Sequence, residues 1–214
     1  DGPDAVAPFL SNLFADPLVL PLPAWLSRPL GKIIVRRRVD EVREKYRRLG
    51  FGGGSPVDCA KIIGARVSNP YLPVRLMKGL FKVVLPPPAL FSVTTTAGTG
   101  TETTMVGVIT DPENHAKFAI TDLKLVPKIA VLDPELMVGL PPHITAATGM
   151  DALTHAVEAY IGLNGNPVTD AYAEQATKLI FENLEKAYND GTDLEARNNM
   201  AMASFYGGAA FTRV

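Results

Sequence analysis

The hydrophobic pattern predicts a single regular element in the first quarter of the chain. Residues 1–31 are rich in proline and show no periodicity. Residues 35–49, VRRRVDEVREKYRRL, instead carry apolar side chains at alternating steps of four and three, which is typical of one helical face. Arginines fill most of the other face. Because Glu41 and Glu44 lie among them, we interpret that face as solvated and not as nucleic-acid-binding. The apolar positions are Val35, Val39, Val42, Tyr46 and Leu49.

The middle of the chain has the pattern of buried strands separated by loops of small residues. The run ALFSV (89–93) predicts a buried strand that leads into the loop TTTAGTGTETT. The segments TMVGVIT and KFAIT flank the turn signal DPENH, which predicts a hairpin. KIAVLDPEL predicts another strand that ends at Asp133–Pro134, whereas residues 70–88 read as loop around a short apolar segment.

After Pro142 the pattern becomes helical. Residues 145–163 are helical by composition, and a second apolar stripe stops at NDG, where Gly191 is expected to cap the helix. TDLE (192–195) reads as a capping box that opens a third helix. An α/β half therefore gives way to an all-helical half near residue 140. The stripe of the second helix is Ala173, Ala176, Ile180, Leu184 and Ala187, and the inward positions expected in the third are Leu194, Met200 and Ala203.

Composition and charge narrow the class of protein. With 47% hydrophobic and 20% charged residues, the 214-residue chain has the balance of an ordinary globular protein. A net charge of −1 gives no overall attraction to nucleic acid or acidic membranes. The two long apolar stretches are FLSNLFADPLVLPLPAWL and LFKVVLPPPALFSV. Prolines and charges interrupt both of them, so neither reaches the roughly 20 uninterrupted apolar residues of a membrane span. The single cysteine, Cys59, suits a reducing compartment. We expect a soluble, cytoplasmic protein with neither nucleic acid nor a membrane as partner.

Two glycine-rich segments are candidates for nucleotide binding. GGGS at residues 52–55 precedes a helical run, and backbone N–H groups at a helix N-terminus bind phosphate well. The loop TTTAGTGTE adds threonine hydroxyls beside Gly98 and Gly100. A glycine cluster alone marks an ordinary loop far more often than a nucleotide site, and the strand expected before GGGS is missing from the pattern. The threonine loop alone is equally typical of an ordinary turn. Together they favour a nucleotide site. Cys59 and Lys61 are interpreted as a small packing residue and a solvated charge.

Asp151 and His155 are candidate metal ligands. Four positions apart in a predicted helix, they share one helical face. Carboxylate oxygen and imidazole nitrogen together suit Fe(II), Zn or Mn. A core histidine paired with a neighbouring carboxylate is the commoner arrangement, and spacing alone does not separate the two. The other two histidines, His115 and His143, are not brought to this pair by any spacing.

Several long motifs, in order, resemble the iron-containing (group III) alcohol dehydrogenases. They are GGGSPVDCAK, TTAGTGTETT, AVLDPEL, GLPPHITAATGMDALTHAVEAY and DLEARNNMAMAS. The resemblance covers about residues 50–214. It implies an α/β, Rossmann-like nucleotide-binding domain over residues 1–140, with residues 1–50 atypical, and the start of an all-α metal-binding domain over 141–214, with catalysis between them.

The resemblance also implies site residues, cofactors and a reaction. The reaction is reversible hydride transfer between NAD(P) and an alcohol or aldehyde, with Fe2+ polarising the substrate oxygen. A zinc-dependent polyol dehydrogenase relative would use the same ligand types. The family often forms homo-oligomers. The implied pyrophosphate contacts are Gly52, Gly53, Gly54 and Ser55; Asp58 lies near the cofactor, Thr95, Thr96 and Thr99 line the nicotinamide side, Lys117 reaches a ribose, and Asp151 and His155 are metal ligands.

Departures from the family pattern are as informative as the matches. The family completes its metal site with two further histidines, in and just beyond a GxxHxxxH-like segment, and GGAAFTRV stops before that segment would begin. The family's opening strands and ribose-reading acid have no counterpart in PLGKIIVRRRVDEV. We therefore expect both domains to be incomplete. The alternative function is a non-catalytic remnant that at most binds nucleotide.

Overall fold

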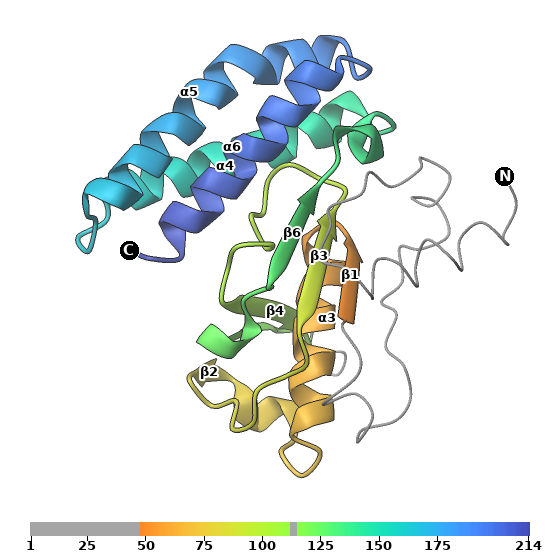
Figure 1. Cartoon of the computed structure of the whole chain (residues 1–214), viewed down its shortest axis with the longest axis vertical. Helices are drawn as coiled ribbons and strands as arrows, with labels where there is room; N and C mark the ends of the chain where they lie inside the picture. The colour runs from red at the N-terminus through yellow and green to blue at the C-terminus, as the bar shows by residue number, and fades with distance from the viewer. Residues whose placement is uncertain (1–47, 112–114) are drawn as a thin grey trace, which may run out of the picture.

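The computed structural model describes residues 48–111 and 115–214, which form a parallel sheet, a second small sheet and a layer of three helices. The three helices lie over the end of the parallel sheet to which its strands point (Figure 1). The aperiodic segment 1–31 and nearly all of the helix predicted over 35–49 lie outside the described residues. The α/β region followed by a helical region confirms the predicted fold class.

The larger sheet is parallel throughout and has the order β1-β3-β6. Its strands are β1 (Arg48–Gly52), β3 (Leu90–Thr94) and β6 (Ile129–Leu132). The central strand β3 is buried at every position, which agrees with its continuous apolar run. Two of these strands were predicted from the sequence at 89–93 and before Asp133, and both predictions are confirmed.

The strand β1 corrects two sequence-based expectations. The strand that should precede the glycine cluster is present, and Leu49 belongs to it and not to a helix. Leu49 and Phe51 alternate with glycines, and each is only 1% exposed. A Cβ at Gly50 would lie 3.3 Å from Cβ of Ala60 on the next helix. The glycines that disguise this strand in the sequence are therefore what allows the helix to pack closely on it.

Helix α3 (Gly54–Ser68) follows the glycine cluster directly, as predicted. It packs against the parallel sheet on one side and against strand β4 on another. Its last turn is closed by Asn69, whose side-chain amide donates to the carbonyl oxygen of Ala65 at 2.8 Å. The helix is therefore held along most of its length by two sheets.

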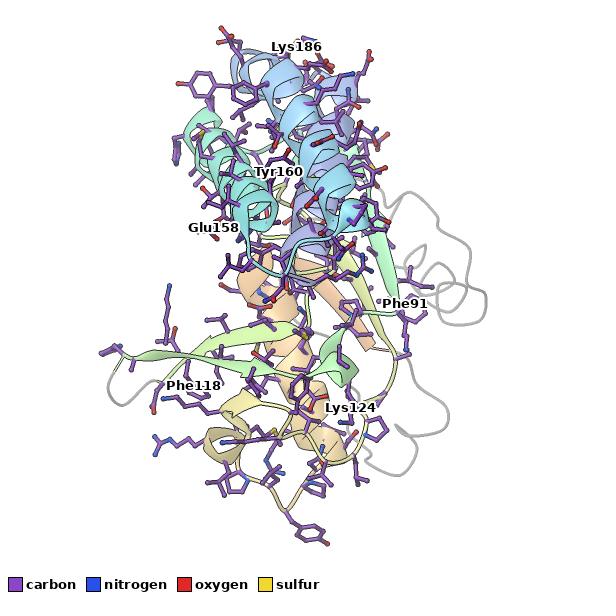
Figure 2. The ribbon with its side chains drawn as sticks, turned by 90° about the vertical axis from the view of Figure 1, so that its left-hand side faces the viewer. Phe91, Phe118, Lys124, Glu158, Tyr160 and Lys186 are labelled. Carbon is purple, nitrogen blue, oxygen red and sulfur yellow. The ribbon has the colours of Figure 1, made fainter. Side chains whose placement is uncertain are left out.

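The second sheet contains the predicted hairpin. Its order is β2-β5-β4, with β4 (Val106–Thr110) antiparallel to β5 (Lys117–Thr121) and the two-residue β2 (Gly79–Leu80) at the edge. Figure 2 shows this hairpin extending beside α3, with Phe118 on β5. Short 3-10 helices complete the connections: η3 (Val74–Met77), η4 (Leu123–Leu125) and η5 (Pro134–Met137).

The helical layer comprises α4 (Pro142–Ile161), α5 (Pro167–Asn189) and α6 (Leu194–Phe211), which pack on one another through small side chains. Small residues let helix axes approach closely, which explains why the stripe predicted for the second helix consists mainly of alanine. No helix in the described part of the chain is long and apolar enough to cross a membrane. The buried small residues include Ala152, Ala156, Ala173, Ala176, Ala201 and Ala203.

Three details of the helix ends differ from the sequence-based predictions. The N-cap of α6 is Asp193, whose carboxylate accepts from the backbone of Ala196, so the capping box predicted at Thr192 is wrong. Leu194, expected to face inward, is 44% exposed because it is the first helical residue. Gly191 was expected to cap the end of α5, a role that usually requires a positive φ. Among the described glycines only those at positions 52, 79 and 100 have a positive φ, so Gly191 does not form such a cap.

Replacement of Gly208 by alanine is expected to destabilise the chain by about 1–3 kcal/mol, the usual cost of overpacking. A Cβ at Gly208 would lie 2.6 Å from Oγ1 of Thr103 and 2.7 Å from Cα of Gly100, and the latter atom is backbone that cannot rotate away. Gly139→Ala is the matched control, because a Cβ there meets nothing within 4 Å. Urea unfolding of the two variants measures the difference. Equal midpoints would contradict the packing described here.

Candidate functional site

Two loops meet at the carboxyl end of the parallel sheet. The glycine loop (residues 52–55) follows β1, and the threonine loop (residues 95–104) follows β3. Gly52 and Thr94 are register partners, and the backbone N–H of Thr95 donates to the carbonyl oxygen of Gly52 at 3.0 Å. Ligands of open α/β sheets bind at this edge of the sheet. The structure therefore brings together the two segments that the sequence indicated separately.

The side chains of the threonine loop fill the space that the glycine loop leaves open. An ideal Cβ at Gly53 would lie 3.2 Å from Oγ1 of Thr96, and one at Gly54 would lie 2.7 Å from Cγ2 of Thr99. Gly52 has φ of +137°, a conformation that favours glycine, and a Cβ there would also meet the Pro56 ring at 2.8 Å. The glycine loop thus needs glycine at position 52 for backbone shape and at position 54 for close contact with its neighbour.

The glycine loop leads into a helix end suited to an anion. Gly53 is the N-cap of α3, no acidic residue occupies the first turn, and Ser55 is exposed. Free backbone N–H groups and the positive end of the helix dipole both favour a phosphate at this point. Gly52, Gly53, Gly54 and Ser55 are therefore placed where pyrophosphate oxygens could be bound.

Asp58 and Lys61 lie on one face of α3 and bind the threonine loop and the strand that follows it. Lys61 is fully buried, so its interpretation as a solvated charge is wrong. Its Nζ donates to the carbonyl oxygens of Thr104 at 2.9 Å and Val106 at 2.7 Å, and to Oγ1 of Thr104 at 3.0 Å. The ammonium lies 3.7 Å from Oδ1 of Asp58. Burial is possible because oxygen acceptors replace the lost water.

The carboxylate of Asp58 is used within the protein. Its Oδ1 accepts from the hydroxyl of Thr101 at 2.6 Å, and its Oδ2 accepts from the backbone N–H of Val108 at 3.1 Å. Asp58 lies one turn into α3, close to the glycine loop, and its hydrogen bonds hold the neighbouring loop and β4. Sequence periodicity could not have revealed this bridge, because its partners are 43 and 50 residues away.

A second buried charge lies inside the threonine loop. Glu102 is 3% exposed, and burial raises its pKa to about 7, although its own backbone N–H and Lys61 act in the opposite direction. Burial also lowers the pKa of Lys61 to about 8, against the opposing effect of Asp58 and Glu102. The base of the loop therefore contains two groups that titrate near neutral pH.

The threonine loop also contacts the helical layer directly. A Cβ at Gly98 would lie 2.7 Å from the carbonyl oxygen of Thr148 on α4, and one at Gly100 would lie 2.7 Å from Cα of Gly208 on α6. The backbone N–H of Gly100 donates to Oγ of Ser204 at 3.3 Å. The loop is thus enclosed between α3 and the helices α4 and α6. The helical residues in this contact were missed from the sequence.

The candidate metal ligands share one face of α4, as their spacing predicted. Nε2 of His155 lies 3.9 Å from Oδ1 of Asp151, and the two side chains are 21% and 45% exposed. The His155 ring lies 5.0 Å from that of Phe211 on α6, and its buried Nδ1 has no hydrogen-bond partner.

This pair does not by itself form a catalytic metal site. Within residues 48–111 and 115–214, no group of three or more histidine, cysteine, aspartate or glutamate side chains could hold a metal ion. Catalytic zinc sites, for comparison, use three protein ligands. Two donors can belong to such a site but cannot close one.

The remaining charged candidates lie elsewhere. Lys117 is exposed and pairs with Thr110 at the turn end of the hairpin. The opposite end of β4, at Val106, is the end bound by Lys61, on the order of 13 Å further along the strand. His115 lies beside the same turn, and His143 is exposed in the first turn of α4. The structure does not group these residues with the glycine loop.

Comparisons with known proteins agree with this arrangement of a nucleotide-type α/β unit and a helical unit. A family model described as iron-containing alcohol dehydrogenase matches residues 37–134. A second, described as the C-terminal part of the Fe-containing alcohol dehydrogenase family, matches residues 145–214. A third model, ferrochelatase, matches residues 1–63 and so overlaps the first.

Individual relatives match the same part of the chain. The NAD-dependent methanol dehydrogenase of Bacillus methanolicus is 48% identical over 163 residues, which is 76% of this chain and 42% of that protein. The crystal structure of 1,3-propanediol oxidoreductase superimposes with a TM-score of 0.73 at 46% identity and covers 78% of this chain and 43% of that one. Sulfoacetaldehyde reductase from Bifidobacterium kashiwanohense, in complex with NAD+, gives 0.72 at 35% identity, with 77% and 44% covered.

Fold and comparisons together define the class as proteins with an α/β unit followed by a helical unit. The chain belongs to the iron-containing alcohol dehydrogenase family. It spans about two fifths of the length of the curated relatives it matches. The resemblance noted in the sequence is therefore confirmed.

Replacement of Glu102 by glutamine is expected to change how stability depends on pH. With a pKa raised from 4.5 to about 7, the folded chain binds this proton more tightly than the unfolded chain. The free energy of unfolding should therefore fall as pH rises from about 4.5 to 7, and Glu102→Gln should remove that contribution. Lys61, with its pKa lowered from 10.5 to about 8, contributes the opposite slope between those values.

Urea unfolding at a series of pH values between 4.5 and 7 measures this effect. Glu182→Gln, an exposed position on α5, serves as the control and should keep the parental slope. The assignment is wrong if the Glu102 variant retains that slope unchanged.

Proposed function

We propose that this chain is the nucleotide-binding and initial helical part of an NAD(P)-dependent alcohol dehydrogenase. The whole protein would transfer a hydride between NAD(P) and an alcohol or aldehyde, in the cytoplasm. The observation that carries the proposal is the contact between the glycine loop and the threonine loop at the carboxyl ends of β1 and β3. Two similar proteins are an NAD-dependent methanol dehydrogenase and a reductase in complex with NAD+.

The roles proposed for individual residues follow from their places in the two loops at the carboxyl end of the parallel sheet. Backbone N–H groups of the glycine loop and Ser55 would bind the pyrophosphate, because the N-terminus of α3 attracts anions there. Thr95, Thr96 and Thr99 would lie along the nicotinamide half of the cofactor. Lys117 remains a proposed ribose contact, which would require the hairpin turn to approach the cofactor. We place the boundary between the two domains at residue 140.

The second candidate function is a nucleotide-binding chain without catalysis. The observation that favours it is the pair Asp151 and His155, which supplies two metal donors where a catalytic site needs more. In the whole protein, these two side chains would be part of the ligand set for Fe2+, with Zn2+ as the alternative. The role of this chain's own residues would be to bind and orient the nucleotide.

Replacement of Gly53 by alanine is expected to weaken NAD+ binding about tenfold or more. A Cβ at this position would occupy the surface that a pyrophosphate must approach, and its nearest neighbour is the flexible side chain of Thr96 at 3.2 Å. Stability should therefore change little. Isothermal titration of the chain with NAD+ and with NADP+ measures affinity and determines which cofactor is preferred.

The control for this experiment is Gly139→Ala, which should bind as the parent does. Lack of saturable binding of either nucleotide to the parental chain would overturn the proposed function. Equal affinity in the parental chain and the Gly53 variant would show that the glycine loop is not the pyrophosphate site.

The chain as given is expected to hold much less than one iron per molecule after anaerobic loading with Fe2+ and desalting. Two ligands bind a divalent ion too weakly to survive desalting, and Asp151→Asn combined with His155→Ala should remove the remainder. Metal analysis by mass spectrometry gives the stoichiometry, and NAD-linked oxidation of a short alcohol gives the activity. One tightly held iron with turnover would rule out the non-catalytic candidate.

A further inference from the structure

We propose that Asp58 and Lys61 are positioning residues, which hold the threonine loop in the conformation that receives the nicotinamide half of the cofactor. The proposal rests on the function proposed above. The two side chains lie one helical turn apart on α3 and face the segment 101–108. Together they make five hydrogen bonds with this segment. Three of the five partners are backbone groups: the carbonyl oxygens of Thr104 and Val106 and the N–H of Val108.

The hydrogen bonds are placed at the end of the loop and at the start of the next strand. Lys61 binds the carbonyl oxygens of Thr104 and Val106, and Asp58 binds the hydroxyl of Thr101. The backbone N–H of Thr101 in turn approaches Oγ1 of Thr99 at 3.4 Å. A chain of contacts therefore runs from α3 to a threonine that lies against the glycine loop.

The chemistry of Lys61 is unusual for a residue whose only role is packing. Burying an ammonium costs several kcal/mol even when it is paired, and an apolar side chain of similar length often stabilises such a position equally well. The ammonium does what a methyl group cannot, because it donates to three oxygens from a single atom. That property fixes loop geometry more than it adds stability.

The proposal can be tested by comparing two nucleotides, because the glycine loop and the threonine loop would contact different parts of the cofactor. The glycine loop would bind the pyrophosphate, which NAD+ and ADP share, whereas the threonine loop would contact only the nicotinamide half, which ADP lacks. Loss of the positioning contacts should therefore reduce affinity for NAD+ by about tenfold and for ADP by less than about threefold. A defect that merely unfolds the chain would reduce both equally.

The experiment compares Lys61→Met and Thr101→Val with the parental chain, by titration with NAD+ and with ADP at a temperature where circular dichroism shows each variant folded. Thr101→Val removes a single hydrogen bond to Asp58 and keeps the shape of the side chain, so it remains informative if the methionine variant fails to fold. A selective loss of NAD+ affinity supports the proposal. An unchanged ratio of the two affinities overturns it, and failure of the parental chain to bind either nucleotide overturns the proposed function instead.

A separate observation indicates that the chain is composite. The ferrochelatase model matches residues 1–63 and the dehydrogenase model matches residues 37–134, so two unrelated descriptions share residues 37–63. The dehydrogenase relatives cover about three quarters of the chain. From this overlap we infer that coding sequences of two different genes are joined in this chain.

The structure limits where the two parts can meet. From Gly52 onward, the glycine loop and α3 contact the dehydrogenase elements through Thr96, Thr99, Thr101 and Thr104. Both partners in each of these contacts must therefore come from the dehydrogenase. The junction therefore falls between residues 37 and 52, and the GGGSP segment at 52–56 belongs to the dehydrogenase.

Amplification from the source DNA with primers in codons 5–15 and 120–130 tests this inference, with primer pairs on either side of the junction as positive controls. We expect the two flanking products and no product across the junction, because the halves come from separate genes. An intact product of the length that this sequence requires would show one continuous gene and overturn the inference.

Discussion

The contact on which the rest of the site depends is the close approach of the threonine loop to α6. Cα of Gly208 would lie 2.7 Å from a Cβ at Gly100, so neither position tolerates a side chain. Gly98 meets α4 in the same way. Because the other side of the loop is bound by Lys61 and Asp58, it has little freedom to move as a unit. The helical layer and the glycine loop are thereby joined through one short segment.

This enclosure explains why ionisable groups occur at the base of the loop. Backbone carbonyls in an irregular segment have no strand or helix partner, and when buried they must find a donor. The ammonium of Lys61 supplies several such bonds from one atom, and Asp58 accepts the N–H of Val108 in the middle of β4. Burial disfavours the charged forms of Lys61 and Glu102. It lowers the pKa of Lys61 to about 8 and raises that of Glu102 to about 7.

The sequence was sufficient for elements whose pattern is local. The strand at 89–93 and the hairpin follow from the apolar pattern and turn residues, and the helices follow from composition and, for α5, from its apolar stripe. The pairing of Asp151 with His155 follows from helical spacing. Strand β1 was missed because its glycines, which α3 requires, have no apolar pattern. Burial of Lys61 was missed because its acceptors lie 43 and 45 residues away, and no local rule describes that distance.

The same distinction separates the two functional parts of the chain. The proposed nucleotide site consists of elements that lie within the described residues: the glycine loop contacts the threonine loop, and the threonine loop contacts α3. The metal pair differs, because His155 keeps a buried Nδ1 without a partner, and the described residues offer no third donor. The pyrophosphate contacts proposed for the nucleotide thus lie within the described residues, whereas metal affinity requires residues that the described part of the chain does not supply.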